Sequence, residues 1–553
     1  MNLIKKISEL EQLKTLSDSS NVIIEEDGVA KRIPAREIGG ADRVQRYYYT
    51  SLAAAVADLN ASTTESADAT VETAACSLYT DSDNEQVLEL LADIELVESL
   101  TITVNSRFNL NGHLISYNGD YSLNFEGGNC VLDGSVAGSK LYKQSVNNTA
   151  SSQLVFMESG KIVGVNFELI VTELGGSHDC ITIQNGNVLV EDCIFAIDCK
   201  YTGSSLRYEV YTVNAKDNSN LTVARSTVNM NTDGKIVNGA IRSNQNAGDA
   251  EVIDSSIIIN GANCGEYGPY GIYLSGKNAD ICSVKNTSVV ANRADGGGFP
   301  VFVTGCKTAI VDNVKVTGNF PAVKGIGMKF SHTDAYITDC FVISSNETIS
   351  TGAGCNGYIS NCTIYGYAHS LYCANGVDYT TFVNDSNIKC KFTDGLTNCG
   401  SIKEPTSCCY IGEGSATGNT VYIDGCTMES VNKNDSGDYA VTVRSNAATP
   451  TTVNLSNCVI DTGLAKPIRI EDGGNDNQLA AVNIGFNTVD ANGNPITKDY
   501  AVDEDVDGVA DANADFLYVT DRLYRRLPVN VQATGKDYEA YYAYLMHLAD
   551  KEG

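Results

Sequence analysis

Four aspartates near the end of the sequence have the spacing of a metal-binding loop. Asp503, Asp505, Asp507 and Asp511, with Gly508 among them, follow the pattern D-x-D-x-D-G-x-x-D. Calcium loops place oxygen ligands at positions 1, 3, 5 and 9 and a glycine at position 6, where the chain turns sharply. Position 12, the usual place of a bidentate glutamate, is alanine here. The run predicts either a calcium site or a solvated acidic linker.

Three tyrosines form a second candidate site. Tyr267, Tyr270 and Tyr273 lie together in a glycine-containing insertion. Aromatic rings bury apolar area against a ligand and leave its hydroxyl groups in water, which suits sugars. Tyrosine- and glycine-rich loops also suit the recognition of proteins. We predict ligand binding at this segment, with packing of the loop onto the rest of the fold as the alternative.

The sequence singles out no catalytic residue. The chain has 68 Asp and Glu residues, so a carboxylate pair of the kind used by glycoside hydrolases can be drawn almost anywhere. The segment Asn231 to Gly234 is similar to the first motif of pectin-cleaving β-helix hydrolases, but their later motifs do not follow in order, and a turn around Asp233 explains it more simply. The histidines, without metal-ligand spacing, are at positions 113, 178, 332, 369 and 547. The enzyme class stays open, and a glycoside hydrolase or polysaccharide lyase is the form it would take.

A short phrase recurs between Val163 and Val489. It consists of an apolar residue, any residue, Asn or Asp, Cys or another small residue, any residue, and a second apolar residue, as in VEDCIF at Val190 and ITDCFV at Ile337. The small residue, called the pivot below, is at positions 193, 226, 255, 287, 314, 340, 362, 386, 426, 458 and 487. One phrase in each repeat of this length predicts a solenoid. Its alternating pattern predicts strands and not helices.

The predicted fold class is therefore all-β. We expect a right-handed parallel β-helix, because crossovers between parallel strands prefer that hand, with a small N-terminal anchor, a capping helix and a short α/β C-terminal segment. About 11 to 14 coils are expected from the repeat.

Four parts are predicted along the chain. Residues 1–40 form an N-terminal module with a hairpin, too small for a core of its own. Residues 41–95 hold a capping helix and the lead-in to the solenoid. Residues 96–490 form the β-helical shaft. Residues 491–553 form an acidic linker and a helical segment in which Tyr541, Leu545 and Leu548 lie near one face.

The cysteines do not have the pattern of a disulfide framework. Five of the 18 cysteines share the pivot position of the repeat, namely Cys193, Cys340, Cys362, Cys426 and Cys458. Equivalent positions stack in a solenoid, so these side chains should form a buried column of small apolar groups. We expect them to be reduced, which suits folding in a reducing cytoplasm.

The formal net charge of −30 limits the partners. Nucleic acid and anionic membrane surfaces both attract Lys and Arg, so we expect neither as a partner. No secretion signal and no apolar stretch of transmembrane length is recognisable, so no membrane insertion is expected.

Two segments resemble known families. KISELEQLKTLSDSSNVIIEEDGVAKRI near the start resembles the short N-terminal module that ties phage fibres and appendages to the virion. YYTSLAAAVADLN, followed by FNLNGHLIS, resembles the start of right-handed β-helix domains in phage fibres, tailspikes and bacterial surface proteins.

These resemblances imply a structural virion protein of a tailed phage. Residues 1–40 would contact other virion proteins, and the shaft, usually a homotrimer in such families, would bind a glycan or protein of the host surface. Folding would take place in the host cytoplasm. A glycan-depolymerising tailspike with paired carboxylates and a bacterial β-helical surface adhesin are the alternatives. Fold resemblance alone does not choose among them.

Overall fold

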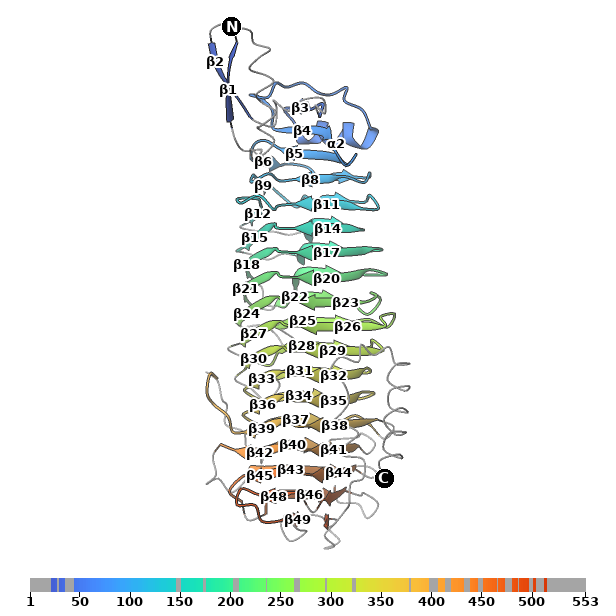
Figure 1. Ribbon diagram of the computed structural model, residues 1–553, viewed down its shortest axis with the longest axis vertical. Helices are drawn as coiled ribbons and strands as arrows, with labels where there is room; N and C mark the ends of the chain where they lie inside the picture. Colours follow the sequence, from blue (N-terminus) through green and yellow to red (C-terminus); the bar gives the residue numbers. More distant parts are fainter. Residues whose placement is uncertain are drawn as a thin grey trace.

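The computed structural model is a long parallel β-solenoid with a single helix among the described residues (Figure 1). It describes residues 21–26, 29–34 and 44–514, apart from 146–150, 173–175, 202–207, 235, 263–268, 294–295, 321–324, 377–378, 397–405, 413–418, 432–437, 446–450, 465, 473–479, 486, 497–500 and 504–511. The all-β fold class is confirmed.

Each coil contributes one strand to each of three parallel sheets. Sheet 1 consists of β7 (Leu100–Ile102), β10 (Leu123–Phe125), β13 (Ser152–Met157), β16 (His178–Ile183), β19 (Tyr208–Ala215), β22 (Ile236–Ser243), β25 (Tyr270–Ser275), β28 (Phe299–Thr304), β31 (Ile326–Ser331), β34 (Glu347–Thr351), β37 (His369–Cys373), β40 (Thr406–Ile411), β43 (Asp438–Ser445), β46 (Ile468–Asp472) and β49 (Ala501–Asp503).

Sheet 2 begins with antiparallel strands and then continues in parallel. It consists of β3 (Tyr47–Tyr49), β4 (Cys76–Thr80), β5 (Gln86–Leu90), β8 (Arg107–Asn109), β11 (Cys130–Asp133), β14 (Gly160–Val163), β17 (Asn187–Glu191), β20 (Asn220–Ala224), β23 (Ala250–Ile253), β26 (Ile281–Lys285), β29 (Thr308–Asp312), β32 (Asp334–Thr338), β35 (Asn356–Ser360), β38 (Thr380–Asn384), β41 (Thr420–Asp424), β44 (Thr451–Ser456), β47 (Ala480–Ile484) and β50 (Ala512–Ala514).

Sheet 3 completes each coil. It consists of β6 (Ile94–Leu96), β9 (Leu114–Tyr117), β12 (Lys140–Ser145), β15 (Asn166–Val171), β18 (Ile194–Lys200), β21 (Thr227–Asp233), β24 (Ser256–Ala262), β27 (Ser288–Arg293), β30 (Lys315–Asn319), β33 (Phe341–Ser344), β36 (Thr363–Gly366), β39 (Asn387–Cys390), β42 (Thr427–Ser430), β45 (Val459–Asp461) and β48 (Val489–Asp490).

The recurring phrase marks the corner between sheet 2 and sheet 3. The Asn or Asp before the pivot has a positive φ, as in Asp192 (55°) and Asn361 (52°). Asn and Asp tolerate this left-handed conformation better than other residues with a Cβ. The phrase therefore encodes the end of one strand, a two-residue corner made of the Asn or Asp and the pivot, and the start of the next strand.

At nine of the eleven pivots a Cys, Ser or Thr side chain points inward and donates a hydrogen bond to the carbonyl two residues earlier. The exceptions are Val314, which has no donor, and Asn487, which is exposed and donates to Asn457 Oδ1. The Cys340 thiol donates to the Thr338 oxygen at 3.1 Å, and the Ser386 hydroxyl donates to the Asn384 oxygen at 2.8 Å. Cys and Ser are interchangeable here because both are small donors. The predicted inward column of cysteines is confirmed, and the 16 cysteines among the described residues are all free and buried.

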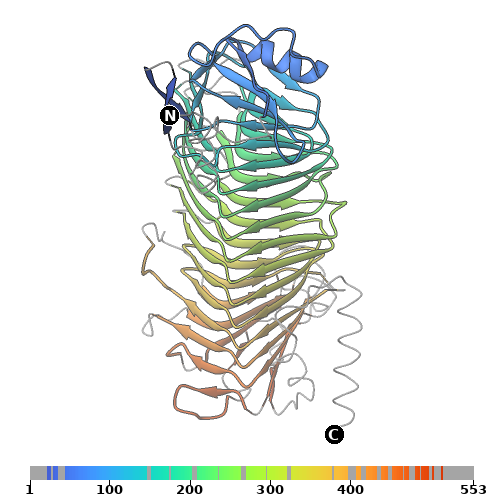
Figure 2. The ribbon, with the colours of Figure 1, turned by 45° about the horizontal axis from the view of Figure 1, so that its top comes forward.

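Helix α2 (Leu52–Ala61) covers the open end of the first coils, as Figure 2 shows. The Ser51 side chain accepts from the amide of Ala54, and the helix buries Leu52, Ala55, Val56 and Leu59 against the first coils. The N-terminal hairpin is also confirmed: β1 (Asn21–Glu26) pairs antiparallel with β2 (Val29–Pro34).

Candidate functional site

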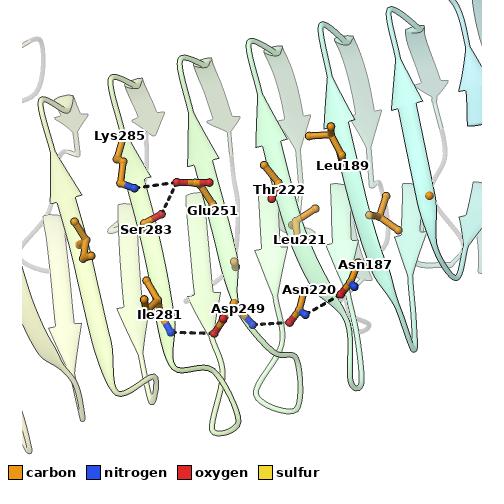
Figure 3. A pocket seen from close by; sticks show the side chains of 14 residues that line it. Asn187, Leu189, Asn220, Leu221, Thr222, Asp249, Glu251, Ile281, Ser283 and Lys285 are labelled. Atoms are coloured by element: carbon orange, nitrogen blue, oxygen red, sulfur yellow. Dashed lines mark hydrogen bonds and ion pairs between the residues drawn. The ribbon is translucent and has the colours of Figure 1, made fainter. Parts of the chain in front are cut away.

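A groove of about 580 Å³ runs across β17, β20, β23, β26 and β29 on the outer face of sheet 2 (Figure 3). Side chains alternate between the two faces of a strand, so the residues between the buried ones point into this groove. The polar and apolar residues that form its walls include Asn187, Leu189, Asn220, Thr222, Asp249, Glu251, Ser283 and Lys285. We call it the sheet 2 groove.

One wall is a row of amide and carboxylate groups near the start of the strands. The Asn220 amide Nδ2 donates to Asn187 Oδ1 at 2.8 Å, and the backbone amide of Asp249 donates to Asn220 Oδ1 at 2.8 Å. Asp249 Oδ1 in turn accepts from the backbone amides of Asp280 and Ile281 at 2.8 and 2.9 Å. The row is held along the rod, coil by coil, which fixes the direction of its remaining donors and acceptors.

The centre of the groove changes from apolar to charged along the rod. Leu189 and Thr222 present aliphatic surface, and the next strand presents Glu251. Glu251 Oε1 accepts from the Ser283 hydroxyl at 3.1 Å and from Lys285 Nζ at 3.0 Å. Neighbouring coils are about 4.8 Å apart, so the groove repeats hydrogen-bonding groups at that interval.

Two of the three tyrosines predicted to bind ligand belong to an aromatic quartet on sheet 1. The rings of Tyr270 and Tyr273 lie 5.2 Å apart; Tyr270 stacks on Phe299 at 5.6 Å and Tyr273 on Phe302 at 5.1 Å. Lys329 Nζ lies 5.2 Å from the Phe299 ring centre and 5.5 Å from that of Phe302. Tyr267 lies outside the described residues.

The quartet has a sequence signal that the prediction missed. Tyr270 and Tyr273 are three residues apart, and Phe299 and Phe302 repeat that spacing 29 residues later. The rings stack on one another along the rod, with interplanar angles of 17° and 15°. The ring faces therefore largely contact other rings of the quartet, so these residues pack against one another in addition to any ligand that they bind.

Asp233 ends β21 and borders a smaller groove of about 410 Å³ on sheet 3. Gly234, with φ of 94°, follows it and begins the corner. Beside it runs an asparagine ladder in which Asn260 donates to Asn231 at 2.9 Å and Asn292 donates to Asn260 at 2.8 Å. The interpretation of this segment as a strand end and turn fits the structure, and Lys200 lies 3.7 Å from Asp233.

The predicted calcium site lies mostly outside the described residues. Asp503 is the last residue of β49, whereas Asp505, Asp507 and Asp511 lie outside the described residues. Within the described ranges, no group of three or more His, Cys, Asp or Glu side chains is arranged to hold a metal ion. Calcium binding stays a prediction.

A buried polar network near the start of the shaft was not predicted. Lys143 Nζ donates to Asp120 Oδ1 at 2.8 Å and to the Ser152 hydroxyl at 2.9 Å, and Ser152 Oγ lies 2.8 Å from His178 Nδ1. Burial, together with the nearby ammonium of Lys143, lowers the pKa of His178 to about 4. Asp120 and Ser152 satisfy the Lys143 ammonium, which would be costly to bury without such partners, whereas His178 Nε2 is buried without a hydrogen-bond partner among the described residues.

Comparison with protein-family models, with curated proteins and with solved structures finds no match to this chain. No helix among the described residues is long and apolar enough to cross a membrane.

Proposed function

We propose that the protein is an adhesion fibre and that the sheet 2 groove binds an extended, neutral polysaccharide. The observation that carries the proposal is the groove itself, which runs along the rod across five coils and offers amide, hydroxyl, carboxylate and ammonium groups around an aliphatic floor. Sugar ligands need this combination, because each unit has an apolar face and a rim of hydroxyls.

The periodicity of the groove supports an extended polymer. Each coil advances about 4.8 Å, a distance close to the rise of one hexose in an extended chain. A regular polysaccharide can then repeat the same contacts on successive coils. The net charge of −30 disfavours anionic glycans at long range, and Lys285 in the groove is already paired with Glu251.

The place of the fibre is part of the same proposal. A shaft of this kind is consistent with a fibre, tailspike or adhesin. The resemblance of the first 40 residues to phage modules supports a virion protein that is anchored through those residues, and the family likeness supports a homotrimer. Light scattering of the full chain and a particle map that locates residues 1–40 test these two points.

The binding proposal is tested by comparing two charge-matched substitutions in one coil. Thr222 lies in the groove on β20, and Asn229 is exposed on β21 of sheet 3. Thr222→Arg should reduce binding on an array of neutral polysaccharides at least several-fold, because the long side chain fills the groove. Asn229→Arg should leave binding unchanged. Equal loss in both variants, or no binding by the unaltered protein, would overturn the proposal.

Glycan cleavage is the second candidate function, with one observation in its favour. Asp249 and Glu251 are two residues apart and both line the sheet 2 groove, so two carboxylates face the same space. Glycoside hydrolases use a pair of carboxyl groups that flank the scissile bond. Incubation with a bound polysaccharide should release reducing ends if the pair is catalytic, and Glu251→Gln should abolish that release without abolishing binding.

A further inference from the structure

A second groove lies on sheet 3, on coils that also carry the sheet 2 groove. It has a volume of about 410 Å³ and crosses the last residues of β18, β21, β24 and β27, which lie one above another in Figure 1. The charged and amide side chains that line it are those of Asp198, Asn231, Asp233, Asn260, Asn292 and Arg293. We call it the sheet 3 groove.

The asparagine ladder forms one wall of the sheet 3 groove. Asn231, Asn260 and Asn292 are direct partners on β21, β24 and β27. Asn260 Nδ2 donates to Asn231 Oδ1 at 2.9 Å, and Asn292 Nδ2 donates to Asn260 Oδ1 at 2.8 Å. Asn319 Nδ2 continues the row with a bond of 3.0 Å to Asn292 Oδ1. All three bonds run in one direction along the rod, so the amides polarise one another.

The ladder uses only part of the hydrogen-bonding capacity of its amides. A side-chain amide has two N–H donors and an oxygen with two lone pairs. At Asn260 the ladder takes one donor and one lone pair. Asn231 and Asn260 are exposed, and Asn292 is half-buried. The row therefore offers a ligand a donor and an acceptor side by side, repeated at intervals of about 4.8 Å.

An aliphatic side chain lies next to the ladder. Ile258 is two residues before Asn260 on β24, so strand alternation places both side chains on the outer face of the sheet. Ile258 is 38% exposed, and its partner on β27, Val290, is half-buried. A ligand group that bonds to the Asn260 amide can therefore place a methyl group on Ile258.

The charges of the sheet 3 groove favour a neutral ligand. Asp198 and Asp233 bring two carboxylates to the groove. Arg293 Nη1 donates to the Gly297 oxygen at 2.6 Å, and Lys200 Nζ lies 3.7 Å from Asp233 Oδ2, so both cations have partners within the protein. In a chain of net charge −30, an anionic ligand is also repelled at long range.

We propose that the sheet 3 groove binds the acetamido group of an N-acetylhexosamine in a neutral glycan. The acetamido oxygen accepts from an N–H of the asparagine ladder, its N–H donates to an asparagine oxygen, and its methyl group packs on Ile258. A hydroxyl at the same place on the sugar supplies the polar contacts and leaves Ile258 in water, so the groove selects the acetamido group. The inference rests on the proposed glycan adhesion, but it uses residues outside the sheet 2 groove.

Calorimetric titration of the full-length protein with two hexasaccharides tests the proposal. The probes are the chitin hexamer and the cellulose hexamer, which share one backbone and differ in the acetamido or hydroxyl group on each unit. Asn260→Leu removes the amide and keeps the size of the side chain. The matched control is Asn220→Leu, because Asn220 donates to Asn187 at 2.8 Å in the equivalent row of the sheet 2 groove. Ile258→Ser is a second variant at an exposed position, which leaves the ladder intact.

We expect the unaltered protein to bind the chitin hexamer about tenfold more tightly than the cellulose hexamer, or better. Asn260→Leu should abolish this preference, Ile258→Ser should reduce it, and Asn220→Leu should leave it unchanged. Equal affinity of the unaltered protein for the two probes would overturn the proposal. A preference that survives Asn260→Leu and Ile258→Ser, or is lost in Asn220→Leu, would overturn it too. Failure of the sheet 2 groove shows separately, as a lack of response to Thr222→Arg.

Discussion

The outer face of sheet 2 has an upper half and a lower half with the same backbone and different side chains. One outward column of the upper half consists of Leu189, Thr222, Glu251 and Ser283. The same column continues through Ile310 into the lower half, where it forms an aromatic ladder of Tyr336, Tyr358, Phe382 and Tyr422. In the upper half the column lines the sheet 2 groove, and in the lower half the rings stack on one another. One residue per coil is therefore enough to change this surface from a groove with mixed side chains to a stack of aromatic rings.

The difference follows from the geometry of a parallel ladder. Equivalent side chains on adjacent strands are about 4.8 Å apart, close to the stacking distance of aromatic rings. Aromatic rings in this column stack on one another. Mixed polar residues form hydrogen bonds with each other only in part, so some of their donors and acceptors remain. The aromatic quartet of sheet 1 shows the same stacking in two columns, Tyr270 on Phe299 and Tyr273 on Phe302, each across two coils.

The largest expected effect separates the two halves by their stability. Phe382→Ala removes a buried ring that is stacked on both sides, and we expect it to lower the free energy of unfolding by about 3–5 kcal/mol. Thr222→Ala, in the same column of the groove, should change it by no more than about 0.5 kcal/mol. Urea unfolding followed by circular dichroism measures both. Similar losses would show that the ladder is not a packing face.

The second effect concerns pH, because each half of the shaft contains one histidine of lowered pKa on sheet 1, namely His178 on β16 and His369 on β37. Burial lowers the pKa of His369 to about 4, and the centre of its ring lies 4.6 Å from that of Tyr410. Burial and the nearby Lys143 ammonium lower the pKa of His178 to about 4 as well. The unfolded value is about 6.5, so the folded chain holds both histidines neutral. The contribution of the two neutral histidines to the free energy of unfolding is fully present above about pH 6.5, and it is lost as the pH falls from 6.5 to 4.

A shift of this size corresponds to about 3 kcal/mol for each histidine. His178→Gln and His369→Gln should each flatten the dependence of the urea midpoint on pH in that window. If only one substitution flattens the pH dependence, only that histidine is kept neutral by the folded chain. If neither does, burial of neutral histidine is not what sets the acid sensitivity.

The third effect tests whether the two halves share one corner. Asn286 in the upper half and Asn361 in the lower half have φ of 48° and 52°. Substitution of either by Ala should cost about 1–2 kcal/mol, because a Cβ without a side-chain amide is disfavoured in this conformation. Substitution by Gly should be nearly neutral. A cost at one position only would mean that the corners are held differently.

The smallest effect is expected at the pivots. Ser255 Oγ donates to the Ile253 oxygen at 2.9 Å, and Cys426 Sγ donates to the Asp424 oxygen at 3.4 Å. Ser255→Cys and Cys426→Ser keep a small donor in each place, and each should change stability by less than about 1 kcal/mol. Cys426→Asp is the contrasting control, since an unpaired buried carboxylate should unfold this coil.

The repeat made most of the fold predictable and most of the site unpredictable. The phrase around Cys193 or Cys340 carries its own strand ends, corner and inward pivot, so local residues alone determine each coil. The groove joins Asn187, Asn220 and Asp249, which are some 30 residues apart, and no local pattern distinguishes an outward Asn that lines a groove from one that only solvates a strand. The tyrosines at 270 and 273 were recognisable as a pair, but their phenylalanine partners required alignment of one coil with the next.

The pairing of the sheets also determines how such a rod carries load. Its backbone hydrogen bonds run along the long axis, so tension between the two ends is borne by every junction between coils in series. The junctions are unequal: β18 and β21 share seven paired positions, whereas β45 and β48 share two, Val459 with Val489 and Ile460 with Asp490. Under tension the rod should therefore part first near its last described coils, and the sheet 2 groove, whose coils share more paired positions, should keep its shape until well after that.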